Sequence, residues 1–147
     1  LLTKVTSVLS AVTTPPTKGT PTVDLLGYCI MGPYMKLNWQ FEENTGGAAG
    51  SGVYLLEIPA GYSIDPDYVS TGTNKHSNVV GSCAVIDSNG TPLDFYGYVV
   101  AYDSTHLAMV VNKTFVGSAY LGLGATDAPT KYSLAAMIPL ENRNYQY

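Results

Sequence analysis

The chain has 147 residues and a formal net charge of -4, and only 12% of its residues are charged. This is the length of one domain, whose core needs no disulfide or metal. The seven Lys and Arg residues are scattered, which argues against a nucleic-acid partner. No apolar run reaches the roughly 20 residues that span a bilayer, which argues against membrane insertion. The start lacks a signal-peptide pattern, and we expect a C-terminal piece of a longer protein.

The first 21 residues differ in composition from the rest of the chain. Apolar residues are spaced by four, three and four positions at Leu1, Val5, Val8 and Val12, and Leu2 and Leu9 lie one heptad apart. This spacing is typical of a coiled-coil seam, and two readings stay open: the end of a multimeric shaft, or an ordinary strand or frayed tail. Residues 13–21 hold three prolines and predict a stiff hinge. We expect a neck or shaft remnant over residues 1–21 and a head domain over residues 22–147.

Short apolar runs separated by turn residues follow along the head domain. Residues 35–42 alternate strictly between apolar and polar, which predicts a half-buried antiparallel strand. Its core-facing residues would be Met35, Leu37, Trp39 and Phe41. The Asn89-Gly90 pair predicts a tight hairpin. Further strands are expected over residues 23–31, 53–58, 79–87, 93–102, 106–112 and 131–140, with a short strand or loop in 117–124. About eight short strands predict an all-β fold, an antiparallel β-sandwich or jelly roll.

Two cysteines, Cys29 and Cys83, lie far apart in the sequence and in apolar runs. Zinc sites need closely spaced ligands, so this spacing argues against a metal site. Free Cys is among the residue types most often buried, and we expect two buried free thiols, with a disulfide as the alternative. The Asp65-Pro66-Asp67 segment lacks the other ligands of a calcium loop, so we prefer to read it as a turn. No cofactor is expected.

The sequence offers little catalytic chemistry. Its two histidines, His76 and His106, lie in a polar stretch and after a turn, and we expect both to be solvated. It contains no nucleophile-elbow motif and no Cys beside a His. The glutamates are expected on solvent faces or at strand ends: Glu42, Glu43, Glu57 and Glu141. We therefore expect a binding or structural domain and not an enzyme.

Tyrosine is in excess, with 12 Tyr against three Phe and one Trp. A Tyr ring has an apolar body and a polar tip, and it is enriched in binding surfaces. Tyr62 and Tyr68 flank Asp65 and Asp67, and with His76 they are our candidate receptor- or ligand-binding residues. A second group shares one strand face at period two: Tyr96, Tyr98 and Tyr102. For both groups the alternative is a sandwich with Tyr at the edge of its core.

Four motifs follow one another between residues 27 and 140. They are Leu37-Asn38-Trp39, the Gly-rich residues 46–52, the run Val53-Tyr54-Leu55-Leu56-Glu57-Ile58-Pro59-Ala60-Gly61-Tyr62, and the ending Tyr132-Ser133-Leu134-Ala135-Ala136-Met137-Ile138-Pro139. This order resembles the C-terminal heads of viral and phage tail fibres. The Gly-Trp that often follows the final Ile-Pro in such heads is absent here, and Leu140-Glu141-Asn142-Arg143 replaces it.

The resemblance implies a jelly-roll homotrimer of the complement and tumour-necrosis-factor type. Such a head attaches a virion to a host cell by binding a surface glycan or protein receptor. It implies a location at the fibre tip on the virion surface, or alternatively an extracellular one. Receptor residues vary freely in these heads, so no binding residue is carried over. Two alternatives remain: a structural virion or decoration module without receptor binding, and a secreted lectin-like carbohydrate-binding module.

Overall fold

The computed structural model describes residues 2–72, 75–87, 93–123 and 130–141. In this part of the chain ten strands form one antiparallel sheet, ordered β1-β3-β4-β10-β6-β7-β8-β5-β2, with β9 beside β8. The strands are β1 (Thr3–Val5), β2 (Leu9–Ala11), β3 (Thr20–Met31), β4 (Tyr34–Thr45), β5 (Tyr54–Glu57), β6 (Val79–Asp87), β7 (Leu93–Ala101), β8 (His106–Val111), β9 (Thr114–Phe115) and β10 (Thr130–Pro139). The only helical element in the described residues is one 3₁₀ turn, η1 (Pro66–Tyr68). The predicted all-β, antiparallel fold class is confirmed.

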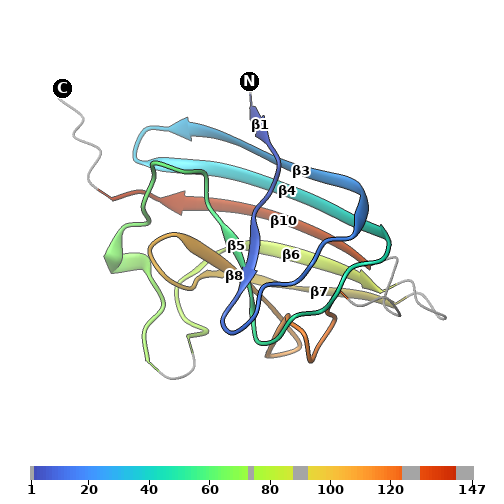
Figure 1. The fold of residues 1–147 in the computed structure, drawn as a ribbon. Helices are drawn as coiled ribbons and strands as arrows, with labels where there is room; N and C mark the ends of the chain where they lie inside the picture. The colour runs from blue at the N-terminus through green and yellow to red at the C-terminus, as the bar shows by residue number, and fades with distance from the viewer. Residues whose placement is uncertain (1, 73–74, 88–92, 124–129, 142–147) are drawn as a thin grey trace.

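The sheet curls into two layers, as Figure 1 shows. In the larger layer β3, β4, β10, β6 and β7 lie side by side, and β8, β5 and β2 form the smaller layer in front of it. β1 and β2 pair at opposite ends of the strand order although only residues 6–8 separate them. The four peptide steps from Val5 to Leu9 span at most about 14 Å. The two ends of the sheet therefore lie close together, and the N-terminal segment closes the sandwich.

The core lies between the layers and follows the alternation of β4 and β10. The four predicted core residues are confirmed, because each is at most 1% exposed: Met35, Leu37, Trp39 and Phe41. On β10 the inward side chains are Tyr132, Leu134, Ala136 and Ile138, and the outward ones are Ser133, Ala135 and Met137. Successive side chains of a strand point to opposite faces, so burial of one face produces this pattern.

The N-terminal segment forms strands, and the coiled-coil reading of it is wrong. β1 pairs with β3, and β2 pairs with β5. Leu9 is 6% exposed, whereas Val8 and Val12, which a heptad seam would bury, are 53% and 51% exposed. A strand has a period of two, so Ser7 and Leu9 point inward while Val8 points outward. The boundary expected between residues 21 and 22 falls inside β3, and residues 3–11 belong to the same sheet as the rest.

Other outcomes concern turns and cysteines. β6 and β7 pair as predicted, and the Asn89-Gly90 turn between them lies outside the described residues. Residues 117–123 form turns and isolated bridges rather than a strand, while β9 adds a short strand that the sequence did not suggest. Cys29 is half-buried and Cys83 is buried, and both are free thiols, so the disulfide alternative is wrong.

Candidate functional site

Three of the five predicted binding residues lie in one 3₁₀ turn. Asp65 caps η1, because its Oδ1 accepts a hydrogen bond from the backbone N–H of Asp67 at 3.0 Å. Tyr68 ends the turn and is 47% exposed. The turn joins the end of the larger layer, since the Asp65 N–H donates to the carbonyl of Pro139 at 2.9 Å. The Asp65 carboxylate thus has the turn-forming role that the sequence favoured over calcium binding.

The other two predicted residues, Tyr62 and His76, pack elsewhere. The Tyr62 ring meets the Tyr28 ring of β3 at nearly right angles, with centroids 6.1 Å apart. His76 is half-buried rather than solvated, and its ring lies 4.5 Å from Phe115 of β9 and 6.5 Å from Tyr98 of β7. The structure therefore does not bring the five predicted residues together into one site.

Two of the three tyrosines predicted to share one strand face, Tyr98 and Tyr102, contact the loop that carries Lys75 and His76. Tyr98 and Tyr102 are half-buried and pack against a small second core cluster on β5, β7 and β8, whereas Tyr96 is 73% exposed. The Lys75 ammonium lies 4.4 Å from the ring centroid of Tyr102 and donates to its carbonyl at 3.2 Å. A cation over an aromatic face is attracted by the ring quadrupole. Two of the three tyrosines thus fit the core-edge alternative.

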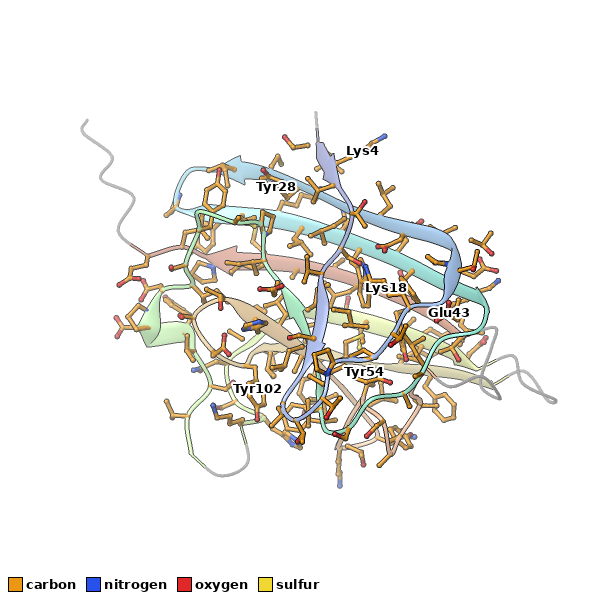
Figure 2. All side chains as sticks on the ribbon, in the orientation of Figure 1. Lys4, Lys18, Tyr28, Glu43, Tyr54 and Tyr102 are labelled. Carbon is orange, nitrogen blue, oxygen red and sulfur yellow. The ribbon has the colours of Figure 1, made fainter. Side chains whose placement is uncertain are left out.

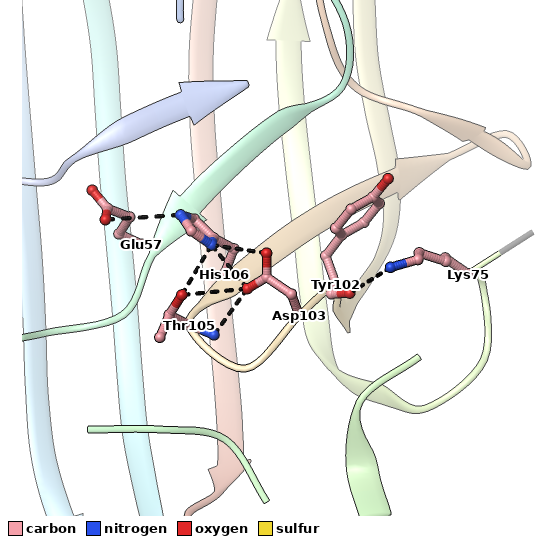
Figure 3. Close-up of polar contacts among 6 residues, drawn as sticks. All are labelled: Glu57, Lys75, Tyr102, Asp103, Thr105 and His106. Atoms are coloured by element: carbon pink, nitrogen blue, oxygen red, sulfur yellow. Dashed lines mark hydrogen bonds and ion pairs between the residues drawn. The ribbon is translucent and has the colours of Figure 1, made fainter. Parts of the chain in front are cut away.

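The strongest polar arrangement surrounds His106, at the start of β8 (Figure 3). Its Nδ1 lies 2.8 and 3.0 Å from the two carboxylate oxygens of Asp103, three residues earlier. On the other side, Nε2 lies 3.8 Å from Glu57 Oε1 on the neighbouring strand β5. The Asp103 carboxylate also accepts the backbone N–H of Thr105 at 2.9 Å, which fixes the turn. His106 is therefore held between two carboxylates and is not the solvated residue that the sequence predicted; its side chain is 20% exposed.

Glu57 also lines a surface hollow of about 400 Å³ beside the N-terminal segment. The hollow lies between β3 and the end of β5, and we call it the Tyr28–Glu57 hollow. Its lining is mostly apolar: Val5, Thr6, Val8, Leu26, Tyr28, Glu57, Ile58, Pro59 and Ala60. Tyr28 adds an aromatic ring, Thr6 a hydroxyl and Glu57 a carboxylate. Ligand pockets typically combine such an apolar lining with a few polar groups and hold about 300–1,000 Å³.

This lining suits a ligand with an apolar face and several hydroxyl groups. An ionised carboxylate such as Glu57 is an acceptor and can take hydrogen bonds from two hydroxyls. The Tyr28 hydroxyl both donates and accepts, and the ring beneath it is apolar. Among the described residues no group of three His, Cys, Asp or Glu side chains is placed to hold a metal ion.

A second unusual group is the buried carboxyl of Glu43, near the C-terminal end of β4 (Figure 2). Glu43 is 0% exposed, and neither of its oxygens has a hydrogen-bond partner in the described part of the chain. It was expected on a solvent face or at a strand end; it does lie near the end of β4, but its side chain is buried rather than on the solvent face. The alternation that buries Trp39 and Phe41 also turns Glu43 inward, so the sequence did contain the signal.

Two chain segments cover Glu43. A Cβ built on Gly47, whose φ is +88°, would lie 2.8 Å from Glu43 Oε2 and 2.7 Å from the Thr17 carbonyl, so both segments approach the carboxyl closely. The Lys18 charge acts on it, but the Lys18 ammonium bonds Asp24 Oδ2 at 2.6 Å. Burial therefore dominates and raises the pKa of Glu43 to about 7, while the Lys18 charge opposes this rise.

Comparison with known proteins supplies no relative from which to transfer a site. The sequence matches no protein-family model, and no curated protein or solved structure is similar enough to match it. In the described part of the chain no helix is long and apolar enough to cross a membrane.

Proposed function

We propose that this chain is a non-enzymatic attachment domain that binds an uncharged glycan in the Tyr28–Glu57 hollow. The observation that carries the proposal is the lining of this hollow, which places a Tyr ring and a carboxylate around an apolar floor of Leu26 and Ile58. The β-sandwich and the motif order that resembles fibre heads support the same reading. In that setting the domain is the receptor-binding head of a viral or phage fibre, displayed on the virion surface.

The charges near the hollow favour a neutral ligand. Glu57 lies in its wall, Asp103 lies behind His106, and the whole chain carries a net charge of -4. An acidic sugar would meet these carboxylates and be repelled, whereas sugar hydroxyls donate hydrogen bonds to them. The apolar face of a sugar ring can lie against the Tyr28 side chain.

The contacts of His106 favour binding over catalysis. In a nucleophilic triad the imidazole contacts an acid through one nitrogen and a hydroxyl or thiol through the other. Here Nδ1 contacts Asp103, but in the described residues Nε2 faces the Glu57 carboxylate. His106 therefore positions Glu57 at the wall of the hollow and does not activate a nucleophile.

A single shallow hollow binds weakly, and attachment needs several copies. A fibre displays its heads together, so that sites of roughly mM strength combine into tight binding through high effective concentration. Several copies of the chain in one assembly would supply such sites together, and the resemblance implies a homotrimer. This part of the proposal predicts that a monomeric sample binds immobilised glycans much more weakly than a multivalent one.

The test is binding of the purified chain, clustered on beads, to immobilised neutral and acidic oligosaccharides. We expect binding to neutral glycans and roughly tenfold weaker binding by Glu57→Gln, since a hydrogen bond to a charged group contributes about 1.5–3 kcal/mol. Glu42→Gln is the matched control, because Glu42 is also a strand carboxylate in one ion pair but lies on the outer face of the larger layer. An unchanged affinity in Glu57→Gln, or no glycan binding at all, would favour the structural module.

A further inference from the structure

The outer face of the larger layer carries several large apolar side chains among polar ones such as Asn38 and Gln40. This face, which we call the open face, carries the outward side chains of β3, β4, β10, β6 and β7. Among the exposed large hydrophobic residues of the described chain, five lie on these strands: Leu25, Met31, Tyr34, Tyr96 and Met137. Leu2, which precedes β1, lies beside Gly27 of β3 on the same face. Large exposed apolar patches on soluble domains mark interaction sites.

The centre of the open face is lined by small side chains. On β10 these are Ser133 and Ala135, and beside them on β6 are Ala84 and Ser82. Small residues at the centre leave the backbone of the sheet accessible to another surface. The larger apolar side chains stand around this centre rather than on it, with Leu25 on β3 and Tyr96 on β7.

Two unpaired charges lie at opposite corners of the open face. Lys36 is on β4, where it pairs with Met137 of β10. Asp94 is on β7, where it pairs with Ile86 of β6, and β7 lies three strands from β4 in the sheet. Both are exposed, and neither has an ion-pair partner among the described residues. Lys131 and Glu42, by contrast, pair with each other at 3.6 Å.

The midpoint between Lys36 and Asp94 coincides with the small-residue centre. Lys36 lies about 20 Å along the strands and about 14 Å across them from Asp94, from the usual residue and strand spacings. The point halfway between the two residues therefore lies between β10 and β6, among Ser133, Ala135 and their neighbours on β6. A two-fold axis in the plane of the face, crossing the Lys36–Asp94 line at right angles at its midpoint, brings each Lys36 against the Asp94 of the other copy.

We propose that the open face docks a second copy of this chain, face to face, through this two-fold axis. The two copies make two Lys36–Asp94 contacts at the corners and close contact of small side chains at the centre. The inference is independent of the glycan site, which lies beside the N-terminal segment.

The size of the face fits a stable contact. Ten residues of β10 extend about 33 Å and five strands span about 24 Å, so each copy offers roughly 800 Å². That is the area per partner of a standard specific interface, about 800 Å². The sheet ends offer less, since β1 and β2 have three residues each and present few free backbone groups. Face-to-face docking of pairs also differs from the homotrimer that the resemblance implies, and the two give different masses.

The test measures the mass of the full chain in solution by sedimentation equilibrium and light scattering. We expect a dimer, and we expect Ala135→Glu to be monomeric because it places a charge on each side of the two-fold centre. Ala135 is exposed, so this variant should fold, which its circular dichroism spectrum checks. The control is Ala119→Glu, at an exposed turn away from the open face, which should remain dimeric.

A charge reversal tests the corner contacts. Lys36→Glu and Asp94→Lys should each weaken the dimer about tenfold at low salt, since two contacts become repulsive in each variant. The double variant restores opposite charges and should return to within about twofold of the parent. A parent that is monomeric at every concentration, a trimer that Ala135→Glu leaves intact, or a double variant as weak as the single ones would each overturn the proposal.

Discussion

The indole of Trp39 stacks on the ring of Tyr132, with centroids 5.6 Å apart and planes 15° from parallel. Phe41 lies against both rings, 6.0 Å from Trp39 and 6.1 Å from Tyr132. From the smaller layer, Tyr54 meets Tyr132 edge to face at 6.5 Å. The Tyr54 hydroxyl also accepts the N–H of Leu123 at 2.8 Å and donates to the Ala49 carbonyl at 2.7 Å. These four rings join the two layers of the sandwich.

Removing Trp39 should therefore destabilise the whole domain. Trp39→Ala should lower the free energy of unfolding by roughly 3–5 kcal/mol, the usual loss for a buried aromatic residue. Trp39 is the only tryptophan, so its fluorescence in the parent should be typical of a buried indole and should shift to longer wavelength on unfolding. Urea denaturation followed by this emission measures the parent, and far-ultraviolet circular dichroism measures the variant.

Trp39→Phe is the informative control. The Trp39 Nε1 group is buried with no hydrogen-bond partner in the described chain, so replacing the indole by a phenyl ring removes no hydrogen bond. The loss should be smaller, roughly 1–2 kcal/mol, because most of the stacked ring remains. A Trp39→Ala variant as stable as the parent would contradict the stacking shown here.

The sequence predicts the central strands well because their signal is local. The alternation of residues 35–42 is visible without knowing any partner strand, and it places Trp39 in the core. The N-terminal strands cannot be recognised in this way, because β1 pairs with β3 and β2 with β5, tens of residues away. Their apolar spacing also matches a heptad, so only the pairing separates the two readings.

The candidate site depends still more on long-range register. Asp103 and His106 are three residues apart across a turn, and their contact could have been proposed from the sequence. The contact with Glu57 exists because β5 and β8 pair with Glu57 opposite His106, which no local pattern fixes. The Tyr28–Glu57 hollow likewise combines side chains from the N-terminal segment, β3 and β5.

The two cysteines should differ sharply in reactivity. Burial raises the pKa of the Cys83 thiol to about 11, so very little reactive thiolate forms near neutral pH. Cys29 faces outward on β3 opposite Lys36 and is half-buried. A thiol reagent at neutral pH should label Cys29 in the folded protein and both cysteines in denaturant. Equal labelling rates for the two cysteines in the folded protein would contradict this placement.

The buried Glu43 should make stability depend on pH. The Glu43 carboxyl has a pKa of about 7 in the folded state and 4.5 when exposed. At a pH between 4.5 and 7, the folded state therefore holds a proton on Glu43 that the unfolded chain has released. The free energy of unfolding should therefore fall by at most roughly 3 kcal/mol as pH rises through this window, and it should stay low at higher pH. Urea unfolding between about pH 5 and pH 8.5 measures this slope.

Two variants separate Glu43 from other titrating groups. Glu43→Gln keeps a neutral side chain of the same size, and it should remove most of the slope and be more stable than the parent at high pH. Glu42→Gln changes the neighbouring carboxyl on the solvent face and should keep the parent slope. A slope that persists in Glu43→Gln would show that Glu43 is not the group responsible.

The closing of the sandwich by the N-terminal segment can be tested at adjacent positions. Leu9 is 6% exposed and belongs to the main core, where it pairs with Leu56 of β5, while Val8 beside it is 53% exposed. If β2 is part of the sandwich, Leu9→Ala should lower the free energy of unfolding by roughly 2–5 kcal/mol, as for other buried leucines. Val8→Ala should change it by less than about 0.5 kcal/mol, as for an exposed residue. A coiled-coil neck would make Val8→Ala costly as well, because Val8 would then lie on the heptad seam with Val5 and Val12. Thermal unfolding of the two variants beside the parent therefore distinguishes a sheet-closing strand from a separate neck.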